Sequence, residues 1–417
     1  MIELLVVAAA VLGYALVSQR LAMSPITAPM VFTAVGLAVG SAGTAWFDLP
    51  VQGEAVSILV EATLVLVLFT DAIRIDLRAL RRQAALPLRL LGLGMPLTIL
   101  VGAGVGAVLV PGLGLPEAAL LAAVLAPTDA ALGQAVVSDR RLPVRIRQTL
   151  NVESGLNDGI AVPVVTVLIA LVAASEKAGA GDWLGLAGQQ ILVGLAVGVS
   201  AGYVGGRLLD LRAARGAVEG VYRQLAAVSI AVLAFSGAHL LGGNGFIAAF
   251  TAGLAFGHVA RGHCAGVQDF TEDEGELLTA ITFVIFGAVL AGPVLGDLSW
   301  QILLYALLSL TVVRMLPVLL ALIGSGTLVE TRLFLGWFGP RGLASILFAL
   351  VVVEELDTPG GGTVFTVAAW TVLLSVFLHG MTASLWSGRL ARRIEQHQPK
   401  AERADVPELP TRRRLQP

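Results

Sequence analysis

Several ionisable side chains lie within long apolar stretches of this 417-residue sequence, where an isolated charge is costly. Holding a charged side chain at the centre of a bilayer costs about 2.5 kcal/mol or more on insertion scales, so such residues are rare unless they have a function. The first candidates for a functional site are Glu61, Asp71, Asp129, Glu153, Asp158, Arg314 and Arg341.

The densest polar group is the segment 151–159, with the sequence NVESGLNDG. If this segment is helical, Glu153 and Asn157 share one face and Asp158 lies about 100° further round. Burial favours the protonated form of a carboxylate, so such a group can hold a proton near neutral pH. Without the proton it offers the oxygen ligands that hard cations prefer. The pattern therefore indicates exchange of a proton for a cation at one carboxylate.

Two proline motifs interrupt apolar segments. They are Ala126-Pro127-Thr128-Asp129-Ala130 and Gly339-Pro340-Arg341-Gly342. Proline lacks a backbone N–H and disfavours helix at the preceding residue, so each motif predicts a helix break. Inside a membrane, unwound backbone is tolerated only where it is buried in protein or lines a wet cavity. Paired breaks in the two halves of a chain are typical of transporter binding sites.

The elements that carry these residues are expected to be membrane-spanning helices. Hydrophobic residues make up 56% of the sequence and charged residues 13%, against about 25% charged residues in soluble domains. The mean hydropathy is +0.85, and the apolar runs have the length of about 20 residues that a helix needs to cross a bilayer. Thirteen spans are expected, at about 3–19, 25–45, 54–73, 86–110, 116–137, 149–174, 183–208, 222–241, 244–260, 277–293, 298–323, 333–352 and 363–386.

The basic residues predict the orientation of these segments. Of the 27 Lys and Arg residues, 24 lie in connections that follow odd-numbered segments or in the C-terminal tail, and Lys177 alone lies in an even-numbered connection. Cytoplasmic loops are enriched in Lys and Arg. We therefore expect a multi-pass protein of the inner cell membrane, with its N-terminus outside and its C-terminus in the cytoplasm.

The positions of the two breaks also suggest an internal repeat. They fall in segments 5 and 12, so segments 1–6 and 8–13 can form two inverted repeats joined by segment 7. Residues 387–417 are polar and contain several prolines. We expect this cytoplasmic tail to be disordered.

Three motifs give the sequence a resemblance to the monovalent cation/proton antiporter family of the sodium/proton exchanger (NhaP-like) type. They are Pro127-Thr128-Asp129, the ESGLNDG sequence at 153–159 and the GPRGLAS sequence at 339–345. The resemblance covers about residues 1–386. It implies an all-α polytopic membrane protein with inverted repeats and two crossing discontinuous helices, which forms a homodimer in the lipid membrane.

The resemblance further implies two domains. Residues 1–85 and 175–297, the latter including the linker helix, would form a dimerisation or scaffold domain. Residues 86–174 and 298–386 would form a mobile core domain that carries the ion.

The resemblance also assigns roles to cation-binding residues. Asp158 occupies the position of the carboxylate shared by the cation and the proton, and Thr128, Asp129 and Ser154 match positions that contribute oxygens to a monovalent cation. Asn157 stands where the electrogenic branch carries a second Asp, which implies exchange of one cation for one proton.

Three further positions match charged residues of the family. Glu153 corresponds to an ion-pairing Glu whose partner is here Arg314, and Arg341 corresponds to a basic residue that offsets helix-end dipoles at the second break. Asp71 stands where many relatives have a Glu, so the negative charge is retained on a side chain that is one methylene group shorter. Pro340 stands where a Leu is more usual.

Several residues keep two interpretations. Asp129 and Asn157 could each bind the cation or cap a broken helix, and Asp71 could be an accessory ligand or a charge near the interface. Glu61 could gate a wet cavity or be a hydrogen-bonding residue of the helix bundle. The histidines at predicted helix ends and loops, which are expected to be solvated, are His239, His258 and His263.

The function that the sequence favours is antiport of a monovalent cation, Na⁺ first and Li⁺ or K⁺ as alternatives, for H⁺. We expect electroneutral exchange by elevator-like alternating access, serving pH homeostasis, with no enzyme activity, no cofactor and no nucleic-acid partner. One alternative is a monovalent cation channel, although one chain offers no ring of carboxylates. The other is an intramembrane enzyme, for which the sequence offers no HExxH or GxSxG motif.

Overall fold

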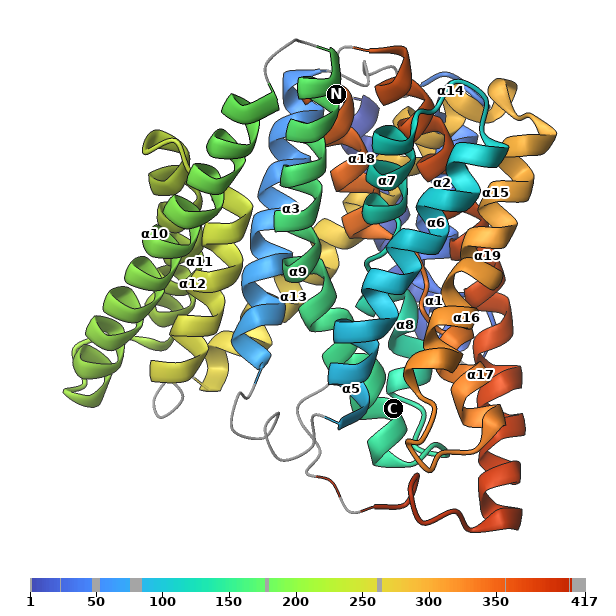
Figure 1. Cartoon of the computed structure of the whole chain (residues 1–417). Coiled ribbons are helices and arrows are strands. Elements are labelled where there is room, and N and C mark those ends of the chain that lie inside the picture. The colour runs from blue at the N-terminus through green and yellow to red at the C-terminus, as the bar shows by residue number, and fades with distance from the viewer. Residues whose placement is uncertain are drawn as a thin grey trace. The chain divides into compact units, whose positions relative to one another are not determined.

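A computed structural model describes residues 2–22, 24–46, 53–75, 85–176, 180–260, 265–356, 358–404 and 406. Over these ranges the chain is helical and contains no strand (Figure 1). The helices are α1 (Ile2–Ala22), α2 (Ala28–Val39), α3 (Glu54–Arg74), α5 (Ala85–Arg89), α6 (Met95–Leu109), α7 (Leu115–Val124), α8 (Ala130–Val137), α9 (Val144–Glu176), α10 (Ala180–Ala214), α11 (Gly220–Leu240), α12 (Gly245–Val259), α13 (Ala265–Ile285), α14 (Gly292–Val294), α15 (Trp300–Leu310), α16 (Val312–Ala321), α17 (Val329–Trp337), α18 (Leu343–Glu355) and α19 (Pro359–His397).

The expected all-helical membrane fold is confirmed. Each of the thirteen apolar segments coincides with a helix or with consecutive helices. Within the described ranges, nine helices are long and apolar enough to cross a membrane. The two expected breaks are present, because α7 ends at Val124 and α8 begins at Ala130, while α17 ends at Trp337 and α18 begins at Leu343.

One segment that was expected to be a single helix is divided. The apolar segment at 298–323 forms α15 and α16, which meet at Thr311 with the non-helical dihedral angles φ −111° and ψ −94°. The Thr311 hydroxyl donates to Leu307 O at 2.6 Å, a bond to the preceding turn that often accompanies a helix bend. Arg314 follows within one turn of this bend.

The chain forms two compact units. Unit 1 contains Met1–Ile58, Ala84–Ser154 and Thr279–Pro417, and unit 2 contains Leu59–Gln83 and Gly155–Leu278. Helix α9 contributes its first turns to unit 1 and the rest to unit 2. The assignment of dimerisation and core domains stays a prediction.

Unit 2 depends on close packing of α10 against α12. Gly194, Gly198 and Gly202 recur every four residues and therefore share one face of α10. A Cβ atom at Gly198 would lie 2.3 Å from Ala248 O, and one at Gly202 would lie 2.2 Å from Ala252 O. Small residues at this spacing let two helix backbones approach closely, as they do in membrane helix pairs.

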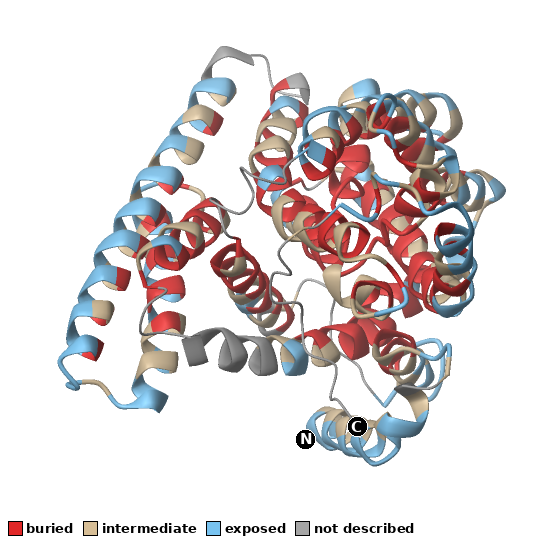
Figure 2. Cartoon of the chain, turned by 90° about the horizontal axis from the view of Figure 1, so that it is seen from below, coloured by how far each residue is buried: buried red, intermediate tan, exposed pale blue. Residues whose placement is uncertain are grey.

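Several helices expose apolar side chains, as lipid-facing helices do. In the most apolar 18-residue window of α1 no residue is buried, and in that of α10 only 17% are. Figure 2 colours exposed residues pale blue. Leu5 and Leu16 of α1 are 68% and 78% exposed. Apolar surface on this scale marks contact with a membrane or with another protein.

The predicted disorder of residues 387–417 is wrong for the first part of the tail. Helix α19 continues to His397 and is followed by Gln398, whose backbone has the left-handed helical conformation. Beyond this turn the buried carboxylate of Glu402 accepts hydrogen bonds from Leu328 N at 2.7 Å and from the Thr331 hydroxyl at 2.9 Å. These contacts are made at the start of α17, whose unpaired N–H groups favour a carboxylate. Composition alone does not reveal such a partner. Residues 405 and 407–417 lie outside the described ranges.

Candidate functional site

The first helix break is closed by Asp129. Its Oδ1 atom accepts hydrogen bonds from Ala131 N at 2.7 Å and Leu132 N at 3.0 Å, so Asp129 is the N-cap of α8. A side-chain oxygen in this position satisfies two N–H groups that have no partner within the helix. Pro127 explains why the chain leaves the helical conformation just before this cap.

Asp129 also caps the second break. Its Oδ2 atom accepts a hydrogen bond from Leu343 N at 2.5 Å, where α18 begins, and its backbone N–H donates to Pro340 O at 2.8 Å. One carboxylate therefore meets the N-terminal ends of both α8 and α18. Each helix end carries a partial positive charge, so a shared negative charge stabilises both.

Arg341 makes the reciprocal contact from the second break to the first. Its guanidinium Nη1 donates to Ala126 O at 2.5 Å and to Pro127 O at 3.1 Å, just beyond the C-terminal end of α7. The residue is fully buried. The C-terminal end of a helix carries partial negative charge, which a cation offsets. This geometry supports the role that the sequence suggested for Arg341.

Two glycines of the second motif leave room for these charged groups. A Cβ atom at Gly342 would lie 2.1 Å from Asp129 Oδ2, and one at Gly339 would lie 2.5 Å from Arg314 Nε. Neither distance can accommodate a carbon atom. A side chain at either position would have to displace the Asp129 carboxylate or the Arg314 guanidinium, so the contacts favour glycine on both sides of Pro340 and Arg341.

The structure brings Glu153 and Arg314 together. Glu153 Oε1 and Arg314 Nη2 are 2.5 Å apart, and both side chains are 2% exposed. The pair joins α9 to α16. Buried charges of opposite sign are retained as pairs because removing one leaves the other uncompensated.

Thr128 and Ser154 place two hydroxyl oxygens side by side. Thr128 Oγ1 and Ser154 Oγ are 3.0 Å apart, and both residues are buried. Thr128 belongs to the first break and Ser154 to α9. Hydroxyl oxygens are neutral ligands for a hard cation, and a cation can bridge two of them at this separation.

Further along α9, Asn157 and Asp158 are 2% and 6% exposed. Because residues four apart share a helix face, Asp158 lies one turn beyond Ser154 on the same side of α9. Helix α3 approaches this turn within unit 2, since a Cβ atom at Gly155 would lie 3.9 Å from Asp71 O. The Asp71 carboxylate is buried and lies 3.8 Å from the Arg74 guanidinium.

The remaining candidates stand outside the two break segments. Glu61 is half-buried on α3, ten residues before Asp71 in the sequence. His239 and His258 are exposed at the ends of α11 and α12. His263 lies outside the described residues.

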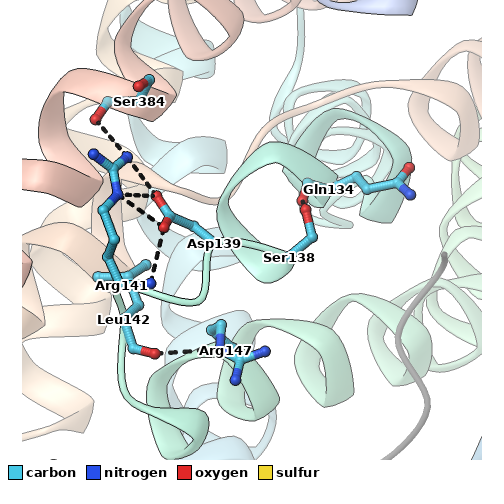
Figure 3. Close-up of polar contacts among 7 residues, drawn as sticks. All are labelled: Gln134, Ser138, Asp139, Arg141, Leu142, Arg147 and Ser384. Carbon is cyan, nitrogen blue, oxygen red and sulfur yellow. Dashed lines mark hydrogen bonds and ion pairs between the residues drawn. The ribbon is translucent and has the colours of Figure 1, made fainter. Parts of the chain in front are cut away.

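The connection between α8 and α9 is held by one ion pair, between Asp139 and Arg141, and by hydrogen bonds to backbone carbonyls (Figure 3). Asp139 accepts hydrogen bonds from Arg141 Nη2 at 2.7 Å and Nε at 3.0 Å, and Arg141 reaches Ser384 O on α19 at 3.4 Å. The hydrogen bond from Arg141 to Asp139 raises the pKa of Arg141. Arg147 Nε donates to Leu142 O at 3.2 Å. These contacts fix where α9 begins and thereby the position of the residues it carries.

The sequence analysis missed two buried residues of α19. Ser375 Oγ accepts a hydrogen bond from Arg341 N at 2.7 Å and lies 3.1 Å from His379 Nδ1. The available signal was a Ser and a His four residues apart in an apolar segment, a spacing that places both on one helix face. The histidines singled out from the sequence were His239, His258 and His263 instead.

Each helix break is capped by a charged residue of the other: Asp129 meets the start of α18, and Arg341 meets the end of α7. Paired helix breaks inside an apolar bundle are typical of secondary transporters. A family model described as "Sodium/hydrogen exchanger, transmembrane" matches residues 6–387. The chain therefore belongs to the sodium/hydrogen exchanger family of multi-pass membrane proteins.

Named relatives and solved structures agree with this family. The chain is 26% identical over 400 residues to Na(+)/H(+) antiporter 2 of Zygosaccharomyces rouxii, with 85% of this chain and 49% of the relative covered. It is 27% identical over 374 residues to the K(+)/H(+) antiporter NhaP of Alkalimonas amylolytica, with 88% and 63% covered. The chain thus spans about half to two thirds of the length of these relatives.

The fold also matches a solved structure. The sodium proton antiporter MjNhaP1 of Methanocaldococcus jannaschii at pH 8 superimposes with a TM-score of 0.77 at 22% identity, covering 91% of this chain and 99% of the other. At this level of identity the likeness establishes the fold.

Proposed function

We propose that this chain is a monovalent cation/proton antiporter in which Asp158 binds the cation and the proton in turn. The observation that carries the proposal is a buried carboxylate one helical turn from Ser154, whose hydroxyl lies 3.0 Å from that of Thr128. The names of the relatives support the same activity, since they are Na⁺/H⁺ and K⁺/H⁺ antiporters.

In this mechanism, deprotonated Asp158 holds a dehydrated Na⁺, with Li⁺ and K⁺ as alternative substrates. Thr128 and Ser154 supply neutral oxygens, and Asp71 is an accessory ligand. Protonation of Asp158 removes its negative charge and releases the cation, so the two occupants exclude each other. Binding of a cation by a carboxylate likewise requires loss of the proton.

For Asp129 the contacts favour the capping interpretation. Its carboxylate accepts hydrogen bonds from three backbone N–H groups at the two breaks. Because these bonds use both carboxylate oxygens, we assign Asp129 the structural role of holding the two breaks together. Asn157 keeps both of its interpretations, as cap or as ligand.

The proposal extends to the transport cycle. The loaded core domain moves relative to a dimerisation domain and exposes the ion on the other side of the membrane. Asn157 is neutral where a second carboxylate would add a charge, so one cation exchanges for one proton. The protein acts as a homodimer in the cell membrane, with its N-terminus outside and its C-terminus in the cytoplasm.

The test is cation-driven proton movement in proteoliposomes, followed with a pH-sensitive dye in the lumen. Wild-type protein should move protons when Na⁺, K⁺ or Li⁺ is added, and Asp158→Asn should abolish this movement. Asp297→Asn, at an exposed carboxylate near the end of α14, is the matched control and should retain it. Exchange that persists in Asp158→Asn would remove Asp158 from this role. Cation flux without a counter-ion would favour the channel alternative.

A further inference from the structure

One face of α19 is directed at the second helix break. Ser375, His379 and Thr382 are spaced by four and three residues, so they share one side of the helix. Ser375 and His379 are almost fully buried, with exposures of 0% and 1%. All three make hydrogen bonds outside their own helix, to the residues between the end of α17 and the start of α18.

These side chains contact both ends of the break. At the α18 end, Arg341 N donates to Ser375 Oγ at 2.7 Å. At the α17 end, His379 Nε2 lies 2.8 Å from Trp337 O, and Trp337 Nε1 donates to Thr382 Oγ1 at 2.9 Å. The Trp337 and His379 rings also lie 4.9 Å apart. Helix α19 therefore fastens the unwound backbone on each side of Pro340.

Both ring nitrogens of His379 have an acceptor within reach. Nε2 lies 2.8 Å from Trp337 O, and Nδ1 lies 3.0 Å from Ser375 O and 3.1 Å from Ser375 Oγ. A carbonyl oxygen can only accept, so the contact with Trp337 O requires a proton on Nε2. Arg341 N, Ser375, His379 and Trp337 O thus form one chain of hydrogen bonds across the second break.

We propose that Ser375 and His379 are positioning residues that hold the second break so that Arg341 and Leu343 N can engage the first. Without Ser375, the N–H of Arg341 would be buried with no partner at the point where α18 begins. If the backbone of the break samples other conformations, the protein spends a smaller fraction of the time in the conformation that binds the cation. The apparent affinity for the cation falls in proportion to that fraction. The inference rests on the proposed function, because the competent site is the one that binds the cation.

The experiment measures the half-saturating Na⁺ concentration and the maximal exchange rate in proteoliposomes for Ser375→Ala and His379→Gln. Each variant removes one link of the chain, worth about 1 kcal/mol, so we expect the half-saturating concentration to rise about fivefold. The maximal rate should change less. Because both residues act in one chain, the double variant should be no worse than the more affected single variant. Ser375→Thr keeps the hydroxyl and should restore affinity.

Thr371→Val is the matched control. Thr371 is buried one turn before Ser375 on α19, but its hydroxyl donates only to Val367 O of the same helix, at 2.7 Å. This variant should leave the half-saturating concentration unchanged. Wild-type affinity in both Ser375→Ala and His379→Gln, in preparations that exchange ions, would overturn the inference.

A second readout does not depend on transport. In ¹⁵N-histidine-labelled wild-type protein, the signal lost in His379→Gln should be that of a ring that carries a proton on Nε2. A ring protonated at Nδ1 alone would overturn the proposed hydrogen bond to Trp337 O. If the wild-type protein exchanges none of the three cations, the proposed function fails, and the tautomer of His379 still tests this inference.

Discussion

At the scale of single residues, Asp129 shows how one side chain can cap the N-terminal ends of two helices. Its Oδ1 atom bonds to the start of α8 and its Oδ2 atom to the start of α18. Capping by one such residue contributes about 1 kcal/mol, and the shared helix-end charge adds to it. The cap and ligand interpretations of Asp129 therefore predict different effects on stability.

Replacing Asp129 with Ala should lower the thermal stability of the purified protein, because two helix starts lose their cap. We expect a loss of about 2 kcal/mol, the sum of two typical caps. Thermal unfolding in detergent measures it, with Asp158→Asn as a comparison that should not share this loss. Wild-type stability in Asp129→Ala, together with loss of cation binding, would instead identify Asp129 as a ligand.

The Glu153–Arg314 pair belongs to the same scale. Both side chains are buried at a separation of 2.5 Å, so Glu153→Leu should destabilise the protein by about 3–5 kcal/mol by leaving Arg314 unpaired. Replacing Arg314 with Met as well should recover most of this loss. Denaturant unfolding compares the variants.

The Glu330–Arg393 pair is the control for this prediction. Its side chains are 44% and 49% exposed, and an exposed pair contributes at most about 1 kcal/mol. Glu330→Gln should therefore have little effect. If Glu153→Leu proved equally harmless, the buried pair would have no structural role.

At the scale of elements, the two breaks work as one unit because each supplies the counter-charge of the other. Asp129 meets the start of α18, and Arg341 meets the end of α7. These reciprocal contacts require the backbones of the two break segments to approach closely, which the absence of a side chain at Gly342 permits. The fit of the breaks can be tested without changing any charge.

Gly342→Ala should impair both exchange and stability, because its Cβ atom would fall 2.1 Å from Asp129 Oδ2. Gly133→Ala is the control, since a Cβ atom there meets nothing within 4 Å in α8. Alanine favours helix over glycine by about 1 kcal/mol, so this control should be neutral or stabilising. The two variants are compared by thermal unfolding and by exchange in proteoliposomes. A tolerated Gly342→Ala would contradict the close contact.

At the scale of the whole molecule, the sequence predicted the apolar helices and the two proline breaks. Hydropathy and length predict apolar helices because the bilayer sets both, and Pro127 and Pro340 predict the breaks because each lies in a motif with neighbouring Gly, Thr or Asp residues and removes a helix hydrogen bond. Pro163 and Pro317, in apolar surroundings, lie within continuous helices. The bend at Thr311 was not predicted, since threonine is common in straight helices, and Thr371 of α19 makes the same hydroxyl hydrogen bond without a bend.

The residues of the site were predicted less completely than the fold. Their positions in the sequence identified charges within apolar segments, and the resemblance to a family supplied the pairing of Glu153 with Arg314. The partners of Asp129, the chain through Ser375 and His379, and the buried Glu402 all depend on which segments distant in the sequence become neighbours. Propensity and composition contain no information about those neighbours.

The central claim is that one carboxylate, Asp158, binds either a cation or a proton. The most direct test is to titrate Na⁺, K⁺ and Li⁺ into unbuffered purified protein and to count the protons released for each cation bound. We predict release of about one proton per cation, and neither binding nor release in Asp158→Asn. Cation binding without proton release, or release that is unchanged in Asp158→Asn, would contradict the claim.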